Sequence, residues 1–130
     1  MVEGVAIALT YLWGAAPTAY LVARLSRGID LRRYGSGNVG AANLMVAVGR
    51  KMGLLVGALD CLVKGALPTA LLRSFWDLPP WVPVGAGLAA VAGHNWSPYL
   101  LFTGGRGLAP ATGALLGSFL WPLLLFHLAL

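Results

Sequence analysis

Residues able to bind an anion are concentrated in one short stretch, 34–43, which reads Y-G-S-G-N-V-G-A-A-N. Its glycine and short polar positions are Gly35, Ser36, Gly37, Asn38, Gly40 and Asn43. Glycine allows positive φ and close approach of the backbone to a ligand, while serine and asparagine supply compact donors and acceptors. A helix starting near Asn38 would add free N–H groups and a positive dipole end. The stretch therefore predicts a phosphate cradle that needs no metal.

A second glycine-rich loop occurs later, in T-G-G-R-G at residues 103–107. Gly104, Gly105 and Gly107 surround Arg106, and the first stretch is flanked by Arg32, Arg33, Arg50 and Lys51. A turn without a ligand is an equally good interpretation of one isolated glycine cluster. Two such loops, each next to arginine and on one predicted face of a membrane, favour an anion site.

Asp60 and Lys64 are two ionisable residues inside an otherwise apolar segment. Four residues apart on a helix, they share a face and could neutralise each other as a structural pair. Because an unpaired charge at membrane depth is costly, such residues are also functional candidates. We slightly favour a functional Lys64, since Gly65 would leave room for a ligand. Asp60 also completes a G-x-G-x-x-G dinucleotide pattern, which we discount because no βαβ unit precedes it.

His94 lies a short distance before the second glycine loop, in G-H-N-W-S-P-Y-L-L-F-T-G-G-R-G. A lone histidine near a helix end most often only makes a hydrogen bond, but this neighbourhood favours an orienting or proton-handling role. Asp60, His94 and Glu3 have no metal-ligand spacing, so we expect no metal site. Cys61 is the single cysteine and excludes an internal disulfide.

The composition is that of a membrane protein. Of the 130 residues, 58% are hydrophobic and only 10% are charged, whereas a soluble domain has roughly a quarter charged residues. The formal net charge of +5 does not indicate nucleic-acid binding, because the basic residues bracket apolar spans and lack interleaved aromatic residues. We expect anionic lipid headgroups and phosphorylated substrates as partners.

The apolar segments predict an all-α, polytopic helical bundle with about four transmembrane helices, at residues 2–25, 52–72, 81–101 and 108–130. Pro17 is expected to kink the first, and Trp76 and Trp81 to anchor the outer interface. The segment 26–51 is the most basic, so the positive-inside rule places it in the cytoplasm with the N-terminus outside. Both glycine loops would then face the cytoplasm.

Three motifs carry a family resemblance: G-S-G-N-V-G-A-A-N, D-C-L-V-K-G-A-L-P and G-H-N-W-S-P-Y-L-L-F-T-G-G-R-G-L-A. In order and spacing they resemble the bacterial membrane-embedded acyl-phosphate:glycerol-3-phosphate acyltransferases, the PlsY family. The likeness runs roughly over residues 21–117. It implies a multi-pass protein of the bacterial inner membrane with its active site facing the cytoplasm.

The resemblance also implies a reaction and its residues. A fatty acyl group would pass from acyl phosphate to the 1-hydroxyl of glycerol 3-phosphate, giving lysophosphatidic acid and phosphate in phospholipid biosynthesis, without a cofactor. The catalytic residues expected by position are Arg106, Lys64, His94 and Ser36. The phosphate-binding positions are Gly35, Ser36, Gly37, Asn38, Gly40, Asn43, Gly104, Gly105 and Gly107. Lysine is the usual family residue at position 106, and arginine keeps the charge.

The sequence departs from the family pattern at several points. Ala42 replaces a usual threonine, Val46 replaces a usual phosphate-binding arginine, and the Asp60 to Lys64 spacing is one residue longer than D-x-x-K-G. The chain stops at Leu130, before the family's third motif, so we expect residues 1–130 to form one acyltransferase-like transmembrane domain that is incomplete at its C-terminus. An inactive or regulatory paralogue that binds phosphorylated ligands, or a small transporter subunit, are the alternatives.

Overall fold

A computed structural model describes residues 1–74, 77–120 and 128. These residues form an all-helical structure without a β-strand. The α-helices are α1 (Val2–Gly14), α2 (Thr18–Arg27), α3 (Ala41–Ala47), α4 (Arg50–Leu59), α5 (Leu67–Ser74), α6 (Trp81–Asn95) and α7 (Leu108–Leu115). Two 3₁₀ turns, η1 (Leu31–Arg33) and η3 (Pro98–Leu100), and two π segments, η2 (Asp60–Ala66) and η4 (Leu116–Leu120), complete the list.

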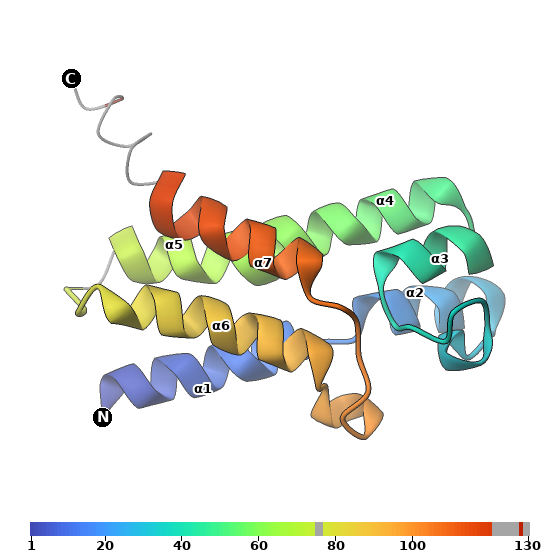
Figure 1. Cartoon of the computed structure of the whole chain (residues 1–130), viewed down its shortest axis with the longest axis horizontal. Helices are drawn as coiled ribbons and strands as arrows, with labels where there is room; N and C mark the ends of the chain where they lie inside the picture. Colours follow the sequence, from blue (N-terminus) through green and yellow to red (C-terminus); the bar gives the residue numbers. More distant parts are fainter. Residues whose placement is uncertain (75–76, 121–127, 129–130) are drawn as a thin grey trace.

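Most helices run along the long axis of the molecule (Figure 1). α4, η2 and α5 follow one another without a break and extend from one end of the molecule to the other. α1, α6 and α7 pack beside this long helix at one end, and α2 and α3 lie with the start of α4 at the opposite end. One glycine loop lies before α3, within the end formed by α2 and α3, and the other lies before α7.

Two segments are long and apolar enough to cross a membrane: Val2–Arg27 and Arg50–Ser74. Helix α6 has 15 residues, or about 22 Å of length, and Leu108–Leu120 is a shorter apolar helix. The all-α prediction is confirmed, whereas the count of four crossings stays a prediction. Most of the C-terminal part of the predicted fourth span, and Trp76, lie outside the described residues.

The first predicted span is interrupted rather than kinked at Pro17. Proline has no N–H and cannot continue the hydrogen-bond pattern of the preceding helix. α1 therefore ends at Gly14, and α2 begins at Thr18 after a tight turn in which the Thr18 N–H donates to the Ala16 carbonyl at 3.0 Å. Residues 15–17 are called the helix break below.

Glycines bring the helices into close contact. A Cβ on Gly93 would overlap the Tyr11 carbonyl of α1, and one on Gly113 would overlap the Cys61 carbonyl of η2. Small residues at such contacts are typical of helix packing in membranes. Gly65 belongs to the same class, because its Cβ would overlap the Pro110 carbonyl. The expectation that Gly65 leaves room for a ligand is therefore wrong: helix α7 fills that space.

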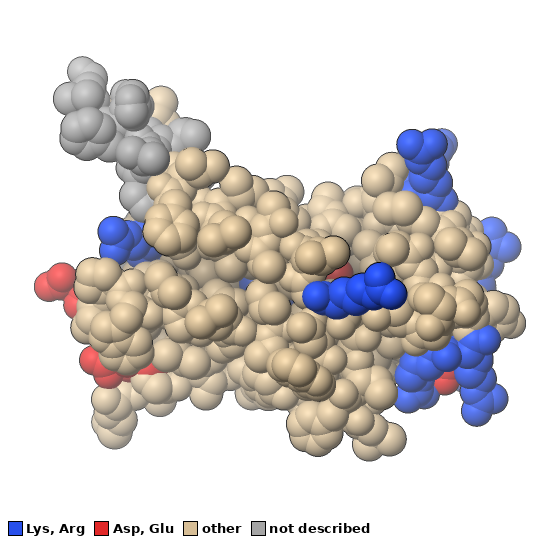
Figure 2. Space-filling view, viewed as in Figure 1, with Lys and Arg blue, Asp and Glu red and all other residues tan. Residues whose placement is uncertain are grey.

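Charge is distributed unequally between the two ends. Most of the blue side chains in Figure 2 gather at the end formed by α2, α3 and the start of α4, and red side chains lie mainly at the opposite end. The basic residues of α2, the adjoining turn η1 and the start of α4 are Arg24, Arg27, Arg32, Arg33, Arg50 and Lys51. A bundle with one basic end fits the predicted orientation, in which that end lies in the cytoplasm.

Candidate active site

The first glycine loop is held in shape by a buried side chain, Asn43. Its Nδ2 shares two N–H groups among the carbonyls of Leu31, Tyr34 and Asn38, at 3.2, 2.9 and 2.9 Å, and its Oδ1 accepts from the Ser36 N–H at 3.1 Å. Asn43 is only 4% exposed. Its amide is thus used inside the loop, where it holds the backbone in shape.

Two glycines of this loop have conformations that other residues rarely adopt. Gly35 has φ +53° and Gly37 has φ +73°, in the left-handed region that glycine enters without steric cost. Helix α3 begins at Ala41 with Gly40 as its N-cap, three residues later than the predicted start near Asn38. The delay has a physical reason: the Asn38 carbonyl is bound by the Asn43 side chain instead of a helical N–H.

The second glycine loop packs against the C-terminal end of α6. A Cβ on Gly104 would overlap the carbonyls of His94 and Asn95, and one on Gly105 would overlap the His94 ring. The Gly105 N–H donates to the His94 carbonyl at 3.0 Å. These two glycines therefore allow close packing on His94.

The two glycine loops meet. The Val39 N–H of the first loop donates to the Gly104 carbonyl of the second at 3.4 Å. Val39 and Gly104 also line a small pocket together with Thr18, Lys64 and His94. Side chains far apart in the sequence are thus brought to one place between the loops and the helix break.

Three of these lining residues, Thr18, Lys64 and His94, belong to a buried polar cluster. Lys64 Nζ is 2.7 Å from Asp60 Oδ1 and donates to Thr18 Oγ1 at 3.0 Å, while the Thr18 hydroxyl donates to Asp60 Oδ1 at 2.6 Å. His94 Nδ1 is 3.9 Å from Asp60 Oδ2. Asp60 is 1% exposed and Lys64 4%. Full pairing is what makes such burial tolerable.

The structure separates the four predicted catalytic residues into two groups. Lys64 and His94 are buried and share the pocket. Ser36 and Arg106 are exposed on the two loops, and within the described part of the chain Arg106 forms no hydrogen bond or ion pair. Arg106 is thus available to an incoming anion from solvent.

Among the flanking basic residues, Arg32 is already engaged. Its guanidinium donates to both carboxylate oxygens of Asp30, at 2.9 and 2.7 Å, and lies 5.4 Å from the centre of the Tyr20 ring. The hydrogen bond from the Arg32 side chain is the main reason that the pKa of Asp30 falls to about 2. Arg33, which follows it, is exposed.

Thr18 is the site residue that sequence reasoning missed. A threonine in an apolar span usually bonds its own helix, and Thr10 does so by donating to the Ala6 carbonyl at 2.7 Å. Thr18 differs because it follows Pro17, at the first position of a new helix. The sequence signal that could have identified Thr18 is a hydroxyl residue directly after a proline within a predicted membrane span.

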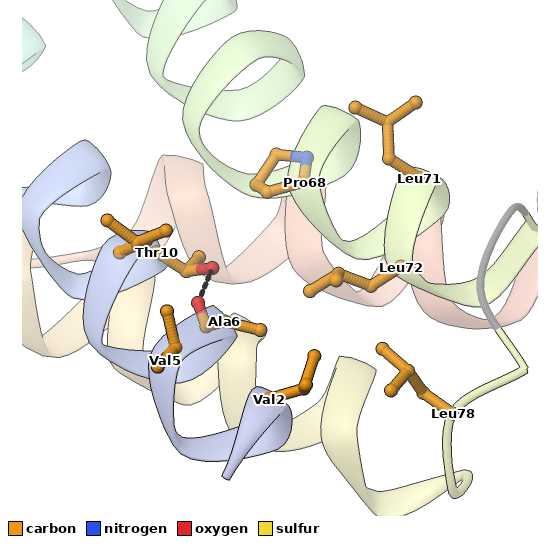
Figure 3. Close-up of a pocket in the computed structure, with 9 residues that line it drawn as sticks. Val2, Val5, Ala6, Thr10, Pro68, Leu71, Leu72 and Leu78 are labelled. Carbon is orange, nitrogen blue, oxygen red and sulfur yellow. Dashed lines mark hydrogen bonds between the residues drawn. The ribbon is translucent and has the colours of Figure 1, made fainter.

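A separate apolar cavity of about 330 Å³ lies between α1 and α5, away from the glycine loops. Figure 3 shows its lining side chains, with the Thr10 hydroxyl turned to the Ala6 carbonyl. Because its lining is almost wholly apolar and that hydroxyl already donates within α1, the cavity suits apolar groups rather than a charged substrate. Among the described residues, moreover, no three His, Cys, Asp or Glu side chains cluster to hold a metal ion.

The class of protein follows from comparison with known families. The model of the family described as glycerol-3-phosphate acyltransferase matches residues 4–130, and the chain belongs to this family. The resemblance seen in the sequence is thereby confirmed. The helical bundle described above is accordingly that of an integral membrane protein.

Particular relatives support this assignment. The chain is 50% identical over 106 residues to glycerol-3-phosphate acyltransferase 4 of Dehalococcoides mccartyi, covering 82% of this chain and 45% of the relative. It is 46% identical over 121 residues to glycerol-3-phosphate acyltransferase 2 of Moorella thermoacetica, covering 93% and 60%. The chain thus spans about half the length of the curated relatives it matches.

Solved structures agree with the fold. The crystal structure of PlsY (YgiH), an integral membrane glycerol 3-phosphate acyltransferase, in its glycerol 3-phosphate form superimposes with a TM-score of 0.83 at 34% identity. The match covers 98% of this chain and 63% of that one. The lysophosphatidic acid form of the same enzyme gives a TM-score of 0.81 at 32% identity.

Proposed function

We propose that the protein transfers a fatty acyl group from acyl phosphate to the 1-hydroxyl of glycerol 3-phosphate. The hydroxyl oxygen would form a bond to the acyl carbon, and the bond from that carbon to the phosphate oxygen would break. The hydroxyl proton would pass to the departing phosphate, so that lysophosphatidic acid and inorganic phosphate leave. Acyl phosphate is already activated, so the reaction needs no cofactor. Relatives named for this acceptor, and a related structure in glycerol 3-phosphate and lysophosphatidic acid forms, support the proposal.

The observation that carries the proposal is the meeting of the two glycine loops beside His94. The Val39 to Gly104 hydrogen bond joins the loop that carries Ser36 and Asn38 to the loop that presents Arg106. Both substrates are phosphorylated, and positioning two anions side by side supplies much of the rate enhancement in such a transfer. In this arrangement Ser36, Asn38 and Arg106 bind phosphate, and His94 orients the acceptor or handles its proton.

An apolar groove begins next to this place. Leu9, Leu12, Trp13 and Tyr99 line it together with Ala16 and Pro17 of the helix break, which also border the pocket between the loops. A fatty acyl chain needs an apolar path that ends at a polar reaction centre. The groove supplies such a path. With the basic end of the bundle in the cytoplasm of a bacterial cell, the acyl chain would lie in the inner membrane.

The test is formation of lysophosphatidic acid by membranes that contain the protein, supplied with acyl phosphate and glycerol 3-phosphate. We expect product that depends on both substrates, and none when acyl-coenzyme A replaces acyl phosphate. Product made equally well from acyl-coenzyme A would contradict the proposed donor. Binding of glycerol 3-phosphate without turnover would favour the alternative that this protein is an inactive paralogue. Val46 supports that alternative, because it is 78% exposed at a position where the family pattern has a phosphate-binding arginine.

A further inference from the structure

Two irregular stretches of backbone lie against each other near the polar cluster: the helix break and the π segment η2. Lys64 of η2 donates to the Ala16 carbonyl of the break at 2.6 Å, and Trp13 at the end of α1 donates from Nε1 to the Val63 carbonyl of η2 at 2.9 Å. Carbonyls released by irregular backbone at membrane depth must be satisfied within the protein. Lys64 of η2 therefore satisfies a carbonyl of the break, and Trp13, two residues before the break, satisfies a carbonyl of η2.

The Lys64 ammonium has no hydrogen-bonding capacity left over. It has three N–H donors, and three oxygens surround it: Ala16 O at 2.6 Å, Asp60 Oδ1 at 2.7 Å and Thr18 Oγ1 at 3.0 Å. Two of these oxygens belong to the break and its following residue. A substrate phosphate could bind Lys64 only by displacing one of them.

We propose that Lys64 is a positioning residue, which together with Asp60 and Thr18 clamps the helix break to η2 and so places the wall of the acyl-transfer site. This inference rests on the proposed function. Ala16, Pro17 and Thr18 border the same small pocket as His94 and Gly104, so the clamp fixes the distance between the break and the second glycine loop. Asp60 extends the clamp toward His94, whose Nδ1 lies 3.9 Å from its Oδ2.

The π geometry of η2 fits this role. An extra residue in a helix is commonly absorbed as a π segment, and such segments are frequent at functional sites. In D-C-L-V-K the four-residue spacing from Asp60 to Lys64 lies wholly within η2. This geometry keeps both side chains on the face that meets Thr18.

A double-mutant cycle tests the proposal in the protein reconstituted into lipid nanodiscs. The variants are Lys64→Met, Asp60→Asn and the double variant, and the measurements are the Tm, the kcat and the KM for glycerol 3-phosphate. Each single substitution leaves a buried group without its partner and should lower the Tm, whereas the double variant should recover most of it. The amide introduced at position 60 keeps an oxygen that can accept from the Thr18 hydroxyl, so the double variant still ties the break to η2 without an unpaired charge. A positioning role therefore predicts that kcat/KM of the double variant exceeds that of Lys64→Met by about tenfold or more.

A direct phosphate contact gives the opposite pattern. The double variant would regain its Tm but stay as inactive as Lys64→Met, because the phosphate ligand would still be missing. That result would overturn the proposal. Lack of turnover in the unsubstituted protein would instead contradict the proposed function. In that case calorimetric binding of glycerol 3-phosphate still tests the role of Lys64. A positioning role predicts that the double variant retains binding, whereas a direct phosphate contact predicts that it loses binding.

Thr18 supplies a matched pair of variants. Thr18→Val keeps the side-chain shape but removes the hydroxyl that both charged groups contact, and Thr18→Ser keeps the hydroxyl. We expect Thr18→Val to raise the KM for glycerol 3-phosphate several-fold, and Thr18→Ser to restore it. A clamp that serves only to stabilise the fold would change the Tm and leave the KM of every folded variant unaltered, and this would refute the positioning role.

Discussion

Arg106 lies exposed on the second glycine loop and, in the part of the chain that the structure describes, has no protein partner. Its guanidinium can therefore make a charge-assisted contact that strengthens as the departing phosphate gains charge. We expect Arg106→Ala to lower kcat about a hundred- to a thousandfold, corresponding to about 2.7–4 kcal/mol of transition-state stabilisation, with a smaller change in KM. Arg106→Lys keeps the charge and should be mild. Turnover unaffected by Arg106→Ala would remove this residue from the site.

Gly37 tests the first loop at the same scale. Its φ is +73°, and a Cβ at this position would lie 3.1 Å from the Arg32 carbonyl, so a β-branched side chain has no place here. We expect Gly37→Val to abolish glycerol 3-phosphate binding in calorimetry while membrane insertion persists. Gly28→Val is the matched control, because Gly28 has φ +68° with nothing within 4 Å of its Cβ position. Equal binding by the two variants would show that the loop is not the cradle.

At the scale of helices, packing depends on glycines that admit a neighbouring backbone. Gly113→Ala would push a methyl group into the Cys61 carbonyl of η2, and overpacking of this kind costs about 1–3 kcal/mol. We expect a lower Tm in detergent for this variant. Gly4→Ala in α1 is the control, since its Cβ would meet nothing within 4 Å. An unchanged Tm for Gly113→Ala would mean that α7 is free to shift.

The sequence predicted local features of this protein better than the contacts between its helices. Glycine positions and apolar runs are local signals, so the loops and the all-α fold could be predicted from them. The engagement of Lys64 by Ala16 and Thr18 could not, because it joins residues 48 and 46 positions apart. Likewise, the glycines at 104 and 105 indicated an anion site, whereas part of their role is packing on His94, which only the folded arrangement reveals.

The whole molecule has one basic end, and this asymmetry predicts its orientation in the membrane. Arg33, beside the first glycine loop, should face the cytoplasm, and Asp77, in the segment between α5 and α6, should face outward, because excess Lys and Arg in short loops are retained inside. In a Cys61→Ala background, single cysteines at positions 33 and 77 can be labelled with a membrane-impermeant maleimide in intact spheroplasts. The cysteine at position 77 should react in intact spheroplasts, and the cysteine at position 33 should react only after lysis. Labelling of position 33 from outside would reverse the topology and move both glycine loops, with Arg106, away from substrates made in the cytoplasm.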